Sequence, residues 1–581
     1  ILPEVGWNVM GTMWIFCNFV QCSGEFFTTT VIEALVLFNW VLFALIIFGL
    51  AVVFDPLGST RFNEQEPTLE ALRHRKVTRL WLRRLQWTFC WMRRDKHGND
   101  AFYHMANLFS SLFRSTDTVP SDYMAGFILM RVKQKRETRE LRRLQLLDEQ
   151  QPIYTLDARK VMADAPEWMS LELANHFLKL STAAYSWPFV MYRYPFSGLF
   201  KLASHMTCCS CLRFKTHTVR DDNCCLCSLA GVRFLSMISH EDILFASFRN
   251  RIFEMPYLVM ADHKTGSIVV VVRGSITLRD VFTDMNASAE RFDAAGLPPN
   301  SMAHRGMTIG AQYIKNDLED LGILDRAFGL YPQYKLVITG HSLGAAVAVL
   351  LGCLMRPKYP QVKVYAHCPP AAVLSREAAR YTEDFVLSIG LGDDFVMRLS
   401  VDSAEDLRTT LLHVLEASHL PKVRHLNYYV FVLNSSEIEK TPWSECANVL
   451  DLTNVIRSCA DGPLLFKSRV KGALVTRSEE SILAKDVPAR RFSRTRLFTP
   501  GRILHITRRK KSSIEKKSSN GGSRYAMRWA IAEEFKQIEV MPRMLLDHLP
   551  ENVSMVLDTI LQEQRDFEHR HRHLHNITIH D

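Results

Sequence analysis

The chain has 581 residues, of which 47% are apolar and 23% charged, so we expect mostly globular domains and exclude a fibrous or fully disordered protein. The formal net charge of +10 at pH 7 is modest for this length, and we expect no nucleic-acid partner. The 13 cysteines are odd in number and follow no regular framework, which favours a reducing compartment.

The first strongly apolar segment, "VIEALVLFNWVLFALIIFGLAVVF", covers residues 31–54. As a helix it would be about 36 Å long, enough to cross a bilayer core of about 30 Å. The alternative is a buried core helix. The preceding residues 1–20 are apolar but are interrupted by Glu4 and Asn8, and they fit the remaining end of an earlier span. Because the chain starts with Ile and has no basic segment before this run, we expect missing N-terminal elements and no signal peptide.

Basic residues follow the predicted span, and none precedes it. This bias predicts that the chain after residue 55 lies in the cytosol. The membrane region is therefore expected at residues 1–56 and a basic, helical linker region at 57–165. Residues 68–94 mix tryptophans with basic residues, which fits either a helix at the inner leaflet or an amphipathic helix packed on the next domain. The basic residues after the span are Arg61, Arg73, Arg75, Lys76, Arg79, Arg83, Arg84, Arg93 and Arg94.

Residues 166–560 are expected to form one globular domain, followed by a tail at 561–581. Buried-strand patterns alternate with helical stretches, which indicates an α/β fold with a mostly parallel sheet. A polar insertion is expected at 435–498, and residues 524–538 are predicted to form a helix after the last strand. The predicted strands lie at 266–275, 334–340, 362–368, 384–392 and 500–506.

A candidate nucleophile lies in "YKLVITGHSLGAAVAVLLGCLMR", where Gly340-His341-Ser342-Leu343-Gly344 joins a strand to a helix. This is the context of a nucleophile elbow, in which small neighbours allow a sharp turn that presents the serine Oγ. The N–H of Leu343 would lie at the helix N-terminus, where it can face an oxyanion. The bare pattern also arises by chance, and the flanking strand and helix favour the catalytic interpretation.

The order Ser, then Asp or Glu, then His predicts the other two members of a triad. Asp393 and Asp394 follow a predicted strand, and we prefer Asp394. His548 lies in a loop beyond the predicted last strand, whereas His505 lies inside that strand and would be held in the sheet. A second oxyanion donor is expected at Ser275, because Arg273-Gly274-Ser275 ends an earlier strand.

These residues resemble a known family. Arg273-Gly274-Ser275 together with G-H-S-L-G looks like the class 3 lipases. The wider match, through "VVFDPLG", "TVPSDYMAG", "AAYSWPFVMYRYPFSGL", "DNCCLC", "PGRILHI" and "DHLP", resembles the sn-1-specific diacylglycerol lipases over nearly the whole chain. The resemblance implies an α/β-hydrolase domain tethered to N-terminal transmembrane helices, four in the family, of a multi-pass protein of the plasma membrane.

The resemblance also implies an activity and a site. Ser342, Asp394 and His548 fall on the family's triad, and Ser275 falls on its oxyanion position. The implied partners are the lipid bilayer and diacylglycerol, whose sn-1 ester is hydrolysed to a fatty acid and a 2-acylglycerol such as the endocannabinoid 2-arachidonoylglycerol. Calcium is implied as a cofactor by resemblance only, since no D-x-D-x-D-G loop is present and the metal ligands are unknown.

Two other functions stay open from the sequence. One is another membrane-tethered serine esterase, acting on phospholipid, monoacylglycerol or acyl-protein. The other is a catalytically inactive lipase fold that serves as a scaffold. The pairs Cys208-x-x-Cys211 and Cys224-x-x-Cys227 fit zinc, acylation or plain thiols. In the insertion, "RRFSR" makes Ser493 a candidate phosphorylation site for a protein kinase and the insertion a candidate regulatory element.

Overall fold

The computed structural model describes residues 6, 8–13, 26–54, 67–95, 97–113, 119–143, 154–155, 157–207, 218–416, 495–508 and 524–577. The chain divides into two compact units. The first comprises Ile1–Glu70, Phe113–Met130 and Leu411–Ser458, and the second comprises Ala71–Leu112, Arg131–Thr410 and Cys459–Asp581. The domain boundaries expected at residues 56 and 165 stay a prediction.

The first unit contains helix α2, Phe26–Phe54, in which the expected span at 31–54 lies. Trp40 Nε1 donates a hydrogen bond to Thr12 Oγ1 at 2.8 Å, which ties α2 to the helical residues 8–13. The side chains of α2 are described only in part. Among the side chains that the structure does describe, no helix is both long enough and apolar enough to cross a membrane.

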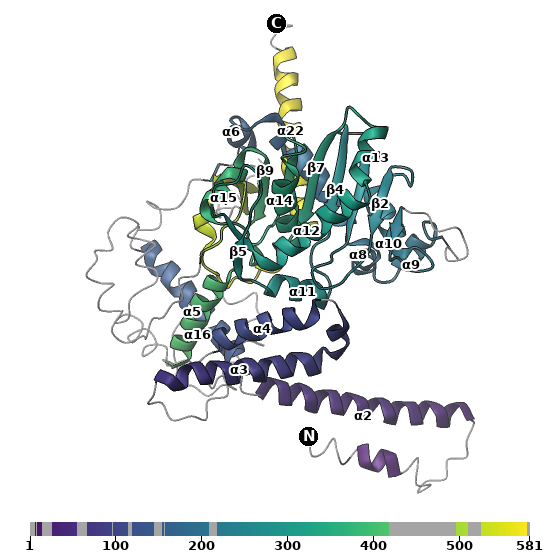
Figure 1. Cartoon of the computed structure of the whole chain (residues 1–581), viewed down its shortest axis with the longest axis vertical. Helices are drawn as coiled ribbons and strands as arrows, with labels where there is room; N and C mark the ends of the chain where they lie inside the picture. Colours follow the sequence, from purple (N-terminus) through teal and green to yellow (C-terminus); the bar gives the residue numbers. More distant parts are fainter. Residues whose placement is uncertain are drawn as a thin grey trace. The chain divides into compact units, whose positions relative to one another are not determined.

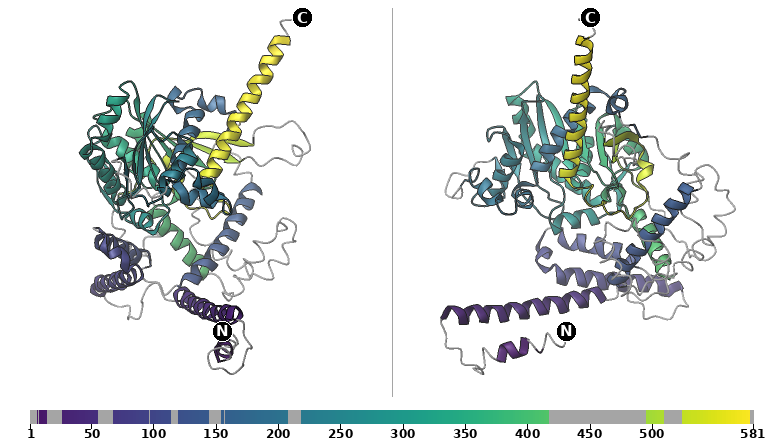
Figure 2. Two further views of the ribbon diagram at one scale, coloured as in Figure 1. Left: turned by 90° about the vertical axis from the view of Figure 1, so that its right-hand side faces the viewer. Right: turned by 180° about the vertical axis from the view of Figure 1, so that it is seen from behind.

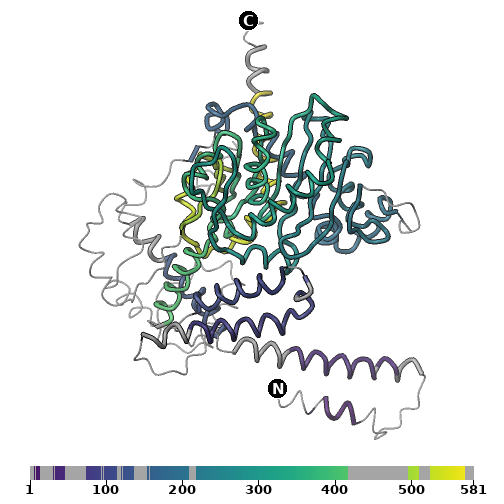
Figure 3. The backbone as a smooth tube through the Cα atoms, in the orientation of Figure 1, coloured from purple at the N-terminus to yellow at the C-terminus, as the bar shows by residue number. Residues whose placement is uncertain are grey.

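The second unit is built on a nine-stranded sheet with the order β1-β2-β3-β4-β7-β8-β9-β10-β11 (Figures 1 and 2). Strands β4, β7, β8, β9 and β10 run parallel to one another, and the antiparallel pairs β2–β3, β3–β4 and β10–β11 lie at the two sides of this group. Two parts of the chain that are far apart in sequence therefore meet, since β10 lies beside β9 (Figure 3). The strands are β1 (Val219–Arg220), β2 (Ile243–Ser247), β3 (Tyr257–Asp262), β4 (Ser267–Val272), β5 (Ala289–Arg291), β6 (Met302–His304), β7 (Lys335–His341), β8 (Lys363–His367), β9 (Val386–Leu391), β10 (Arg502–Arg508) and β11 (Tyr525–Ala530).

Helices cover both faces of this sheet (Figure 2). Helices α12, α13 and α14 pack into one apolar core, and α7 and α22 pack into the other. Strand β4, "SIVVVV", is buried along its whole length because side chains on both of its faces enter a core. The helices are α2 (Phe26–Phe54), α3 (Pro67–Thr88), α4 (Gly98–Leu112), α5 (Pro120–Arg143), α6 (Ala158–Met162), α7 (Leu171–Ala183), α8 (Ser186–Arg193), α9 (Gly198–Ala203), α10 (Cys227–Ser236), α11 (Leu278–Met285), α12 (Arg305–Asp320), α13 (Ile323–Leu330), α14 (Leu343–Met355), α15 (Arg376–Tyr381), α16 (Val401–Glu416) and α22 (Pro550–Ile577).

The expected α/β fold with a mostly parallel sheet is confirmed, and the five predicted strands correspond to β4, β7, β8, β9 and β10. The helix predicted at 524–538 is wrong. Residues 525–530 form β11, which pairs antiparallel with β10 from Ile503 to Arg508. Without β11, strand β10 would leave unpaired N–H and C=O groups at the edge of the sheet. Pairing with residues 525–530 satisfies these groups, and this gain outweighs the helical propensity of "YAMRWA". The 500–506 strand is therefore not the last one.

The basic, tryptophan-rich stretch at 68–94 contains α3, and one face of α3 packs on α4. Leu85 is buried in a cluster with Phe102 and Met105, and the rings of Trp81 and Phe109 lie 4.8 Å apart. Trp87 and Trp91 are exposed. The Phe89 ring also lies 5.2 Å from the ring of Phe282 in the α/β domain. Packing on the next domain, the second of the two alternatives, therefore accounts for one face of this stretch.

Candidate active site

The turn between β7 and α14 holds Ser342 in a strained backbone conformation. Its φ is +60° and its ψ is −128°, a region that residues other than glycine rarely adopt. The turn is tight because both glycines lack side chains. A Cβ on Gly340 would lie 2.3 Å from the carbonyl oxygen of Gly344, and a Cβ on Gly344 would lie 2.3 Å from that of Val272. The strand, the turn and the helix are those expected of a nucleophile elbow.

Ser342, His548 and Asp394 form one hydrogen-bonded chain. Ser342 Oγ lies 2.9 Å from His548 Nε2, and Asp394 Oδ2 lies 2.9 Å from His548 Nδ1. The three residues come from the elbow, the loop after β9 and the loop before α22, which are far apart in sequence. The structure therefore brings together the three residues that the sequence predicted as a triad.

The two neighbouring aspartates differ in their contacts. Asp394 is buried, and its second oxygen, Oδ1, accepts hydrogen bonds from the backbone N–H groups of Val396 at 2.8 Å and Met397 at 3.4 Å. Asp393 instead donates its backbone N–H to Asp547 Oδ2 at 3.2 Å, and burial raises the pKa of its carboxyl group. Of the two candidates, Asp394 is the one that contacts the imidazole of His548.

Two residues that the sequence analysis did not identify hold the backbone of His548 in place. The hydroxyl of Tyr185 lies 2.8 Å from His341 Nδ1, and His341 Nε2 lies 2.8 Å from the carbonyl oxygen of His548. Burial, followed by the proximity of His548, holds the pKa of His341 well below its usual range. Neutral His341 can therefore donate from Nε2 and accept at Nδ1, and it fixes the backbone of His548. His341 lies inside the G-x-S-x-G motif, but nothing in the sequence around Tyr185 indicates this role.

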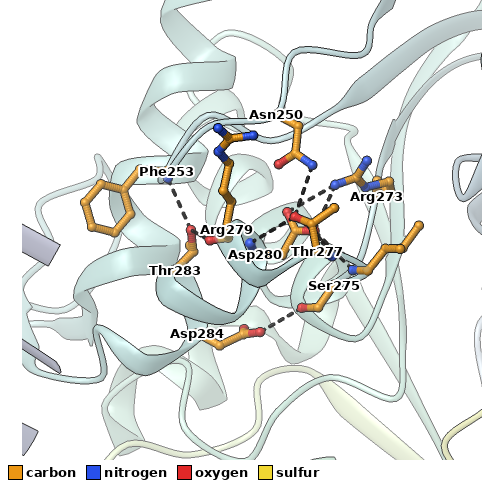
Figure 4. A network of polar contacts seen from close by, with 10 residues as sticks. Asn250, Phe253, Arg273, Ser275, Thr277, Arg279, Asp280, Thr283 and Asp284 are labelled. Atoms are coloured by element: carbon orange, nitrogen blue, oxygen red, sulfur yellow. Dashed lines mark hydrogen bonds and ion pairs between the residues drawn. The ribbon is translucent and has the colours of Figure 1, made fainter. Parts of the chain in front are cut away.

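A buried ion pair shapes the loop after β4, which carries Ser275 (Figure 4). Arg273 Nη2 lies 2.9 Å from Asp280 Oδ2, and the same oxygen accepts from the backbone N–H groups of Ile276 and Thr277. Thr277 caps α11 and shares a reciprocal capping box with Asp280. The "RGSIT" loop is thus held by Asp280, seven residues beyond Arg273.

Gly274 allows the same loop to approach the elbow. A Cβ at this position would lie 2.4 Å from the carbonyl oxygen of His341 and 2.2 Å from the hydroxyl of Tyr185. Val272 pairs with Gly340 in adjacent parallel strands, so Ser275 and Ser342 both follow the same edge of the sheet. Leu343, the other predicted oxyanion donor, is buried and begins α14 at the positive end of the helix dipole.

The side chain of Ser275 points to a second carboxyl group, Asp284 (Figure 4). Ser275 Oγ donates to Asp284 Oδ2 at 2.7 Å. Burial raises the pKa of Asp284 to about 7, and the hydrogen bond from Ser275 opposes this rise. This hydrogen bond fixes the rotamer of Ser275 and leaves the backbone N–H of Ser275 as the group that can face a substrate oxygen.

Calcium as a cofactor stays a prediction, which the side chains of the described residues do not support. Among them, one group of at least three metal-ligating side chains lies close enough together to share an ion, namely His341, Cys368 and His548, whose ligand atoms are within 4.8 Å of one another. Imidazole nitrogen and thiol sulfur do not suit calcium, which takes oxygen ligands.

Two other predicted features fall partly or wholly outside the described residues. Cys227 is a free thiol, whereas Cys208 and Cys211 are not described, so zinc, acylation and plain thiols stay open for these pairs. Ser493 and the insertion at 435–498 lie outside the described residues except for 495–498, so their regulatory role and the kinase stay predictions.

Comparison with known proteins gives two family matches. Residues 269–404 match the family "Lipase (class 3)", and residues 1–54 match the family "Diacylglycerol lipase N-terminal transmembrane region".

Full-length relatives give the same result. Diacylglycerol lipase-beta from Mus musculus is 32% identical over 97% of this chain and 82% of its own length. Diacylglycerol lipase-alpha from Homo sapiens is 29% identical over 97% of this chain, which spans about half (54%) of that relative's length. Among solved structures, the mono- and diacylglycerol lipase from Aspergillus oryzae matches 40% of this chain and 74% of its own chain, with 21% identity and a TM-score of 0.28.

Proposed function

The chain belongs to the diacylglycerol lipase family, and on this basis we propose that it is a membrane-bound serine lipase that hydrolyses the sn-1 ester of diacylglycerol. The products would be a free fatty acid and a 2-acylglycerol, such as 2-arachidonoylglycerol. The observation that carries the proposal is the hydrogen-bonded chain from Ser342 through His548 to Asp394. In this arrangement Ser342 is the nucleophile, His548 the general base and Asp394 the acid that orients the imidazole.

The proposed reaction follows from these contacts. His548 Nε2 takes the proton from Ser342 Oγ as the oxygen attacks the carbonyl carbon of the ester. The backbone N–H groups of Ser275 and Leu343 stabilise the oxyanion that forms. His548 then protonates the departing glyceride oxygen, which leaves an acyl group on Ser342. Water, deprotonated by His548, releases the fatty acid and restores the serine.

The neighbouring groups favour this proton transfer. Asp394 is buried and holds His548 Nδ1, so the Nε2 lone pair faces Ser342 and the imidazolium that forms next is stabilised. The second histidine beside it, His341, does not compete, because its low pKa keeps it neutral and its carbonyl contact keeps it in place. His548 is therefore the one histidine of this pair that is placed to move a proton.

The membrane attachment belongs to the same proposal. The match of residues 1–54 to an N-terminal transmembrane family supports a span at 31–54, and the basic residues that follow it support a cytosolic catalytic domain. A tether of this kind would hold the active site beside a substrate that resides in the bilayer. The plasma membrane is proposed from the family resemblance alone.

The test is product analysis with the full chain reconstituted in vesicles that contain diacylglycerol labelled in its sn-1 or its sn-2 acyl chain. The proposal requires labelled fatty acid from the sn-1 substrate, labelled monoacylglycerol from the sn-2 substrate, and neither product from Ser342→Ala. Hydrolysis of phospholipid, monoacylglycerol or acyl-protein in preference to diacylglycerol would favour the other esterases. Absence of any turnover and of labelling by a fluorophosphonate would favour an inactive scaffold.

A further inference from the structure

The segment that forms α8 and α9 exposes an unusual number of large apolar side chains. Phe196 is 96% exposed and Phe200 is 79% exposed. Leu199, Tyr192 and Trp187 are also exposed, and all five residues lie within a stretch of 14. Soluble proteins rarely present such a contiguous apolar group unless it meets another surface.

This exposure does not arise from loose packing. Helices α8, α9 and α10 lie side by side (Figure 1), and they share a small core of their own. Val190, Leu202 and Ala230 are fully or almost fully buried between the three helices. Gly231 brings α10 against the start of α8, since a Cβ there would lie 2.2 Å from the backbone nitrogen of Trp187. The helices are thus fixed with Phe196 and Phe200 on their outer side.

The chemistry of this surface matches that of a membrane interface. Tryptophan and tyrosine favour the headgroup level, and phenylalanine and leucine favour the acyl boundary. The segment 186–207 carries Arg193 and Lys201 and contains no Asp or Glu. Both basic side chains are exposed, and Lys201 Nζ lies 4.4 Å from the centre of the Tyr194 ring. Such a surface complements the negative charge of a leaflet with anionic lipids.

The surface is also linked directly to the candidate active site. Tyr185, the residue before α8, contacts His341 through its hydroxyl. At the end of α8, Arg193 Nε lies 3.7 Å from Glu551 Oε1, three residues beyond His548. A contact between this surface and a bilayer would therefore fix the position of the triad relative to the lipid.

We propose that the exposed surface of α8, α9 and the turn between them, comprising Trp187, Tyr192, Phe196, Leu199 and Phe200, docks into the headgroup region of a bilayer that contains anionic lipid. The inference rests on the proposed function, because a lipase acting on a bilayer lipid must reach its substrate from that surface. It adds a second membrane contact, independent of the N-terminal region, next to the site itself.

Photocrosslinking tests the docking without requiring turnover. The photoreactive phenylalanine analogue p-benzoylphenylalanine is placed at position 196 of the full chain, which is reconstituted in vesicles of phosphatidylcholine and phosphatidylserine and irradiated. The matched control carries the analogue at position 330, where Leu330 is 67% exposed at the end of α13. We expect lipid adducts from position 196 and none from 330, with a lower yield when phosphatidylserine is omitted. Equal yields at the two positions, no lipid adduct at 196, or a crosslink from 196 to a second protein chain would overturn the proposal.

A pair of variants connects docking with catalysis. Phe196→Ala combined with Phe200→Ala should lower hydrolysis of diacylglycerol in vesicles about tenfold, because two apolar anchors are lost. The same double variant should hydrolyse a soluble short-chain ester at a rate within about twofold of the parent. The control Leu330→Ala should stay within about twofold of the parent with both substrates. Loss of both activities would show a folding defect, and the crosslinking result would then decide. A parent chain that labels lipid but releases no fatty acid from diacylglycerol would refute the proposed function and leave the docking surface intact.

Discussion

Replacing Asp394 by asparagine should reverse the tautomer of His548 with almost no change in shape. Asp394 Oδ1 accepts from the N–H groups of Val396 and Met397, and Oδ2 accepts from His548 Nδ1. An asparagine must keep its carbonyl oxygen toward those backbone donors, so its NH₂ group faces His548. The imidazole then accepts at Nδ1 and carries its proton on Nε2, where it can no longer take the proton of Ser342.

The expected magnitude is large because the wrong tautomer removes the general base. We expect kcat on a soluble ester to fall about 10⁴-fold, which corresponds to about 5.4 kcal/mol in the activation free energy. Asp393→Asn is the matched control, since Asp393 contacts Asp547 through its backbone, whereas the imidazole of His548 is bound by Asp394. It should stay within about threefold of the parent.

The assay compares kcat and KM of the parent and both variants on a soluble p-nitrophenyl ester in detergent, with thermal unfolding as the check on folding. KM should change little, because the tautomer affects the chemical step. If Asp393→Asn proves the more damaging change, or if Asp394→Asn retains more than about a tenth of the parent kcat while folded, the assignment of Asp394 as the orienting acid is wrong.

Three further outcomes follow from the structure. Gly274→Ala should lower kcat about 10²–10³-fold with the fold retained, because its Cβ would collide with the His341 carbonyl and move the Ser275 oxyanion donor. The control is Gly329→Ala, which should leave kcat unchanged because the added Cβ meets no atom within 4 Å. Equal kcat values for the two variants would contradict this account. The carboxyl of Asp284 has a pKa of about 7 in the folded protein and about 3.9 when unfolded, so its contribution to stability falls as pH rises from about 4 to about 7 and is constant above that range. The difference in Tm between Asp284→Asn and the parent, measured by calorimetry, should therefore be more favourable to the variant at pH 8 than at pH 5. An identical pH dependence of Tm in the two proteins would refute the assignment. Removal of residues 1–60 should preserve hydrolysis of a soluble ester and reduce hydrolysis of diacylglycerol in vesicles, and equal vesicle activity would argue against a tether.

The sequence was sufficient to predict the centre of the sheet and the residues that meet at its edge. The strands β4, β7, β8 and β9 are nearly continuous apolar runs, which is what burial on both faces requires. The order of Ser342, Asp394 and His548 along the chain, relative to those strands, then identified the three residues that the structure joins by hydrogen bonds.

The parts that could not be predicted depend on tertiary contacts. Residues 525–530 have good helix formers, and only the open edge of β10 makes them a strand. The support of His548 by His341 and Tyr185 joins residues more than 150 positions apart, with no local pattern to indicate it. Asp280 and Asp284 lie on one short helix, α11, after the "RGS" loop. Their spacing of four residues indicates a shared helix face, but it does not identify their separate partners, Arg273 and Ser275.

The most direct test of the central claim is the fate of a labelled acyl chain on Ser342. The full chain in vesicles is incubated briefly with diacylglycerol labelled in the sn-1 acyl group, quenched in acid and digested, and the peptides are analysed by mass spectrometry. The proposed mechanism predicts an acyl ester on Ser342, labelled fatty acid in solution and unlabelled 2-acylglycerol, with all three absent in Ser342→Ala. Release of labelled fatty acid that persists in Ser342→Ala, or an acyl ester on a different residue, would contradict it.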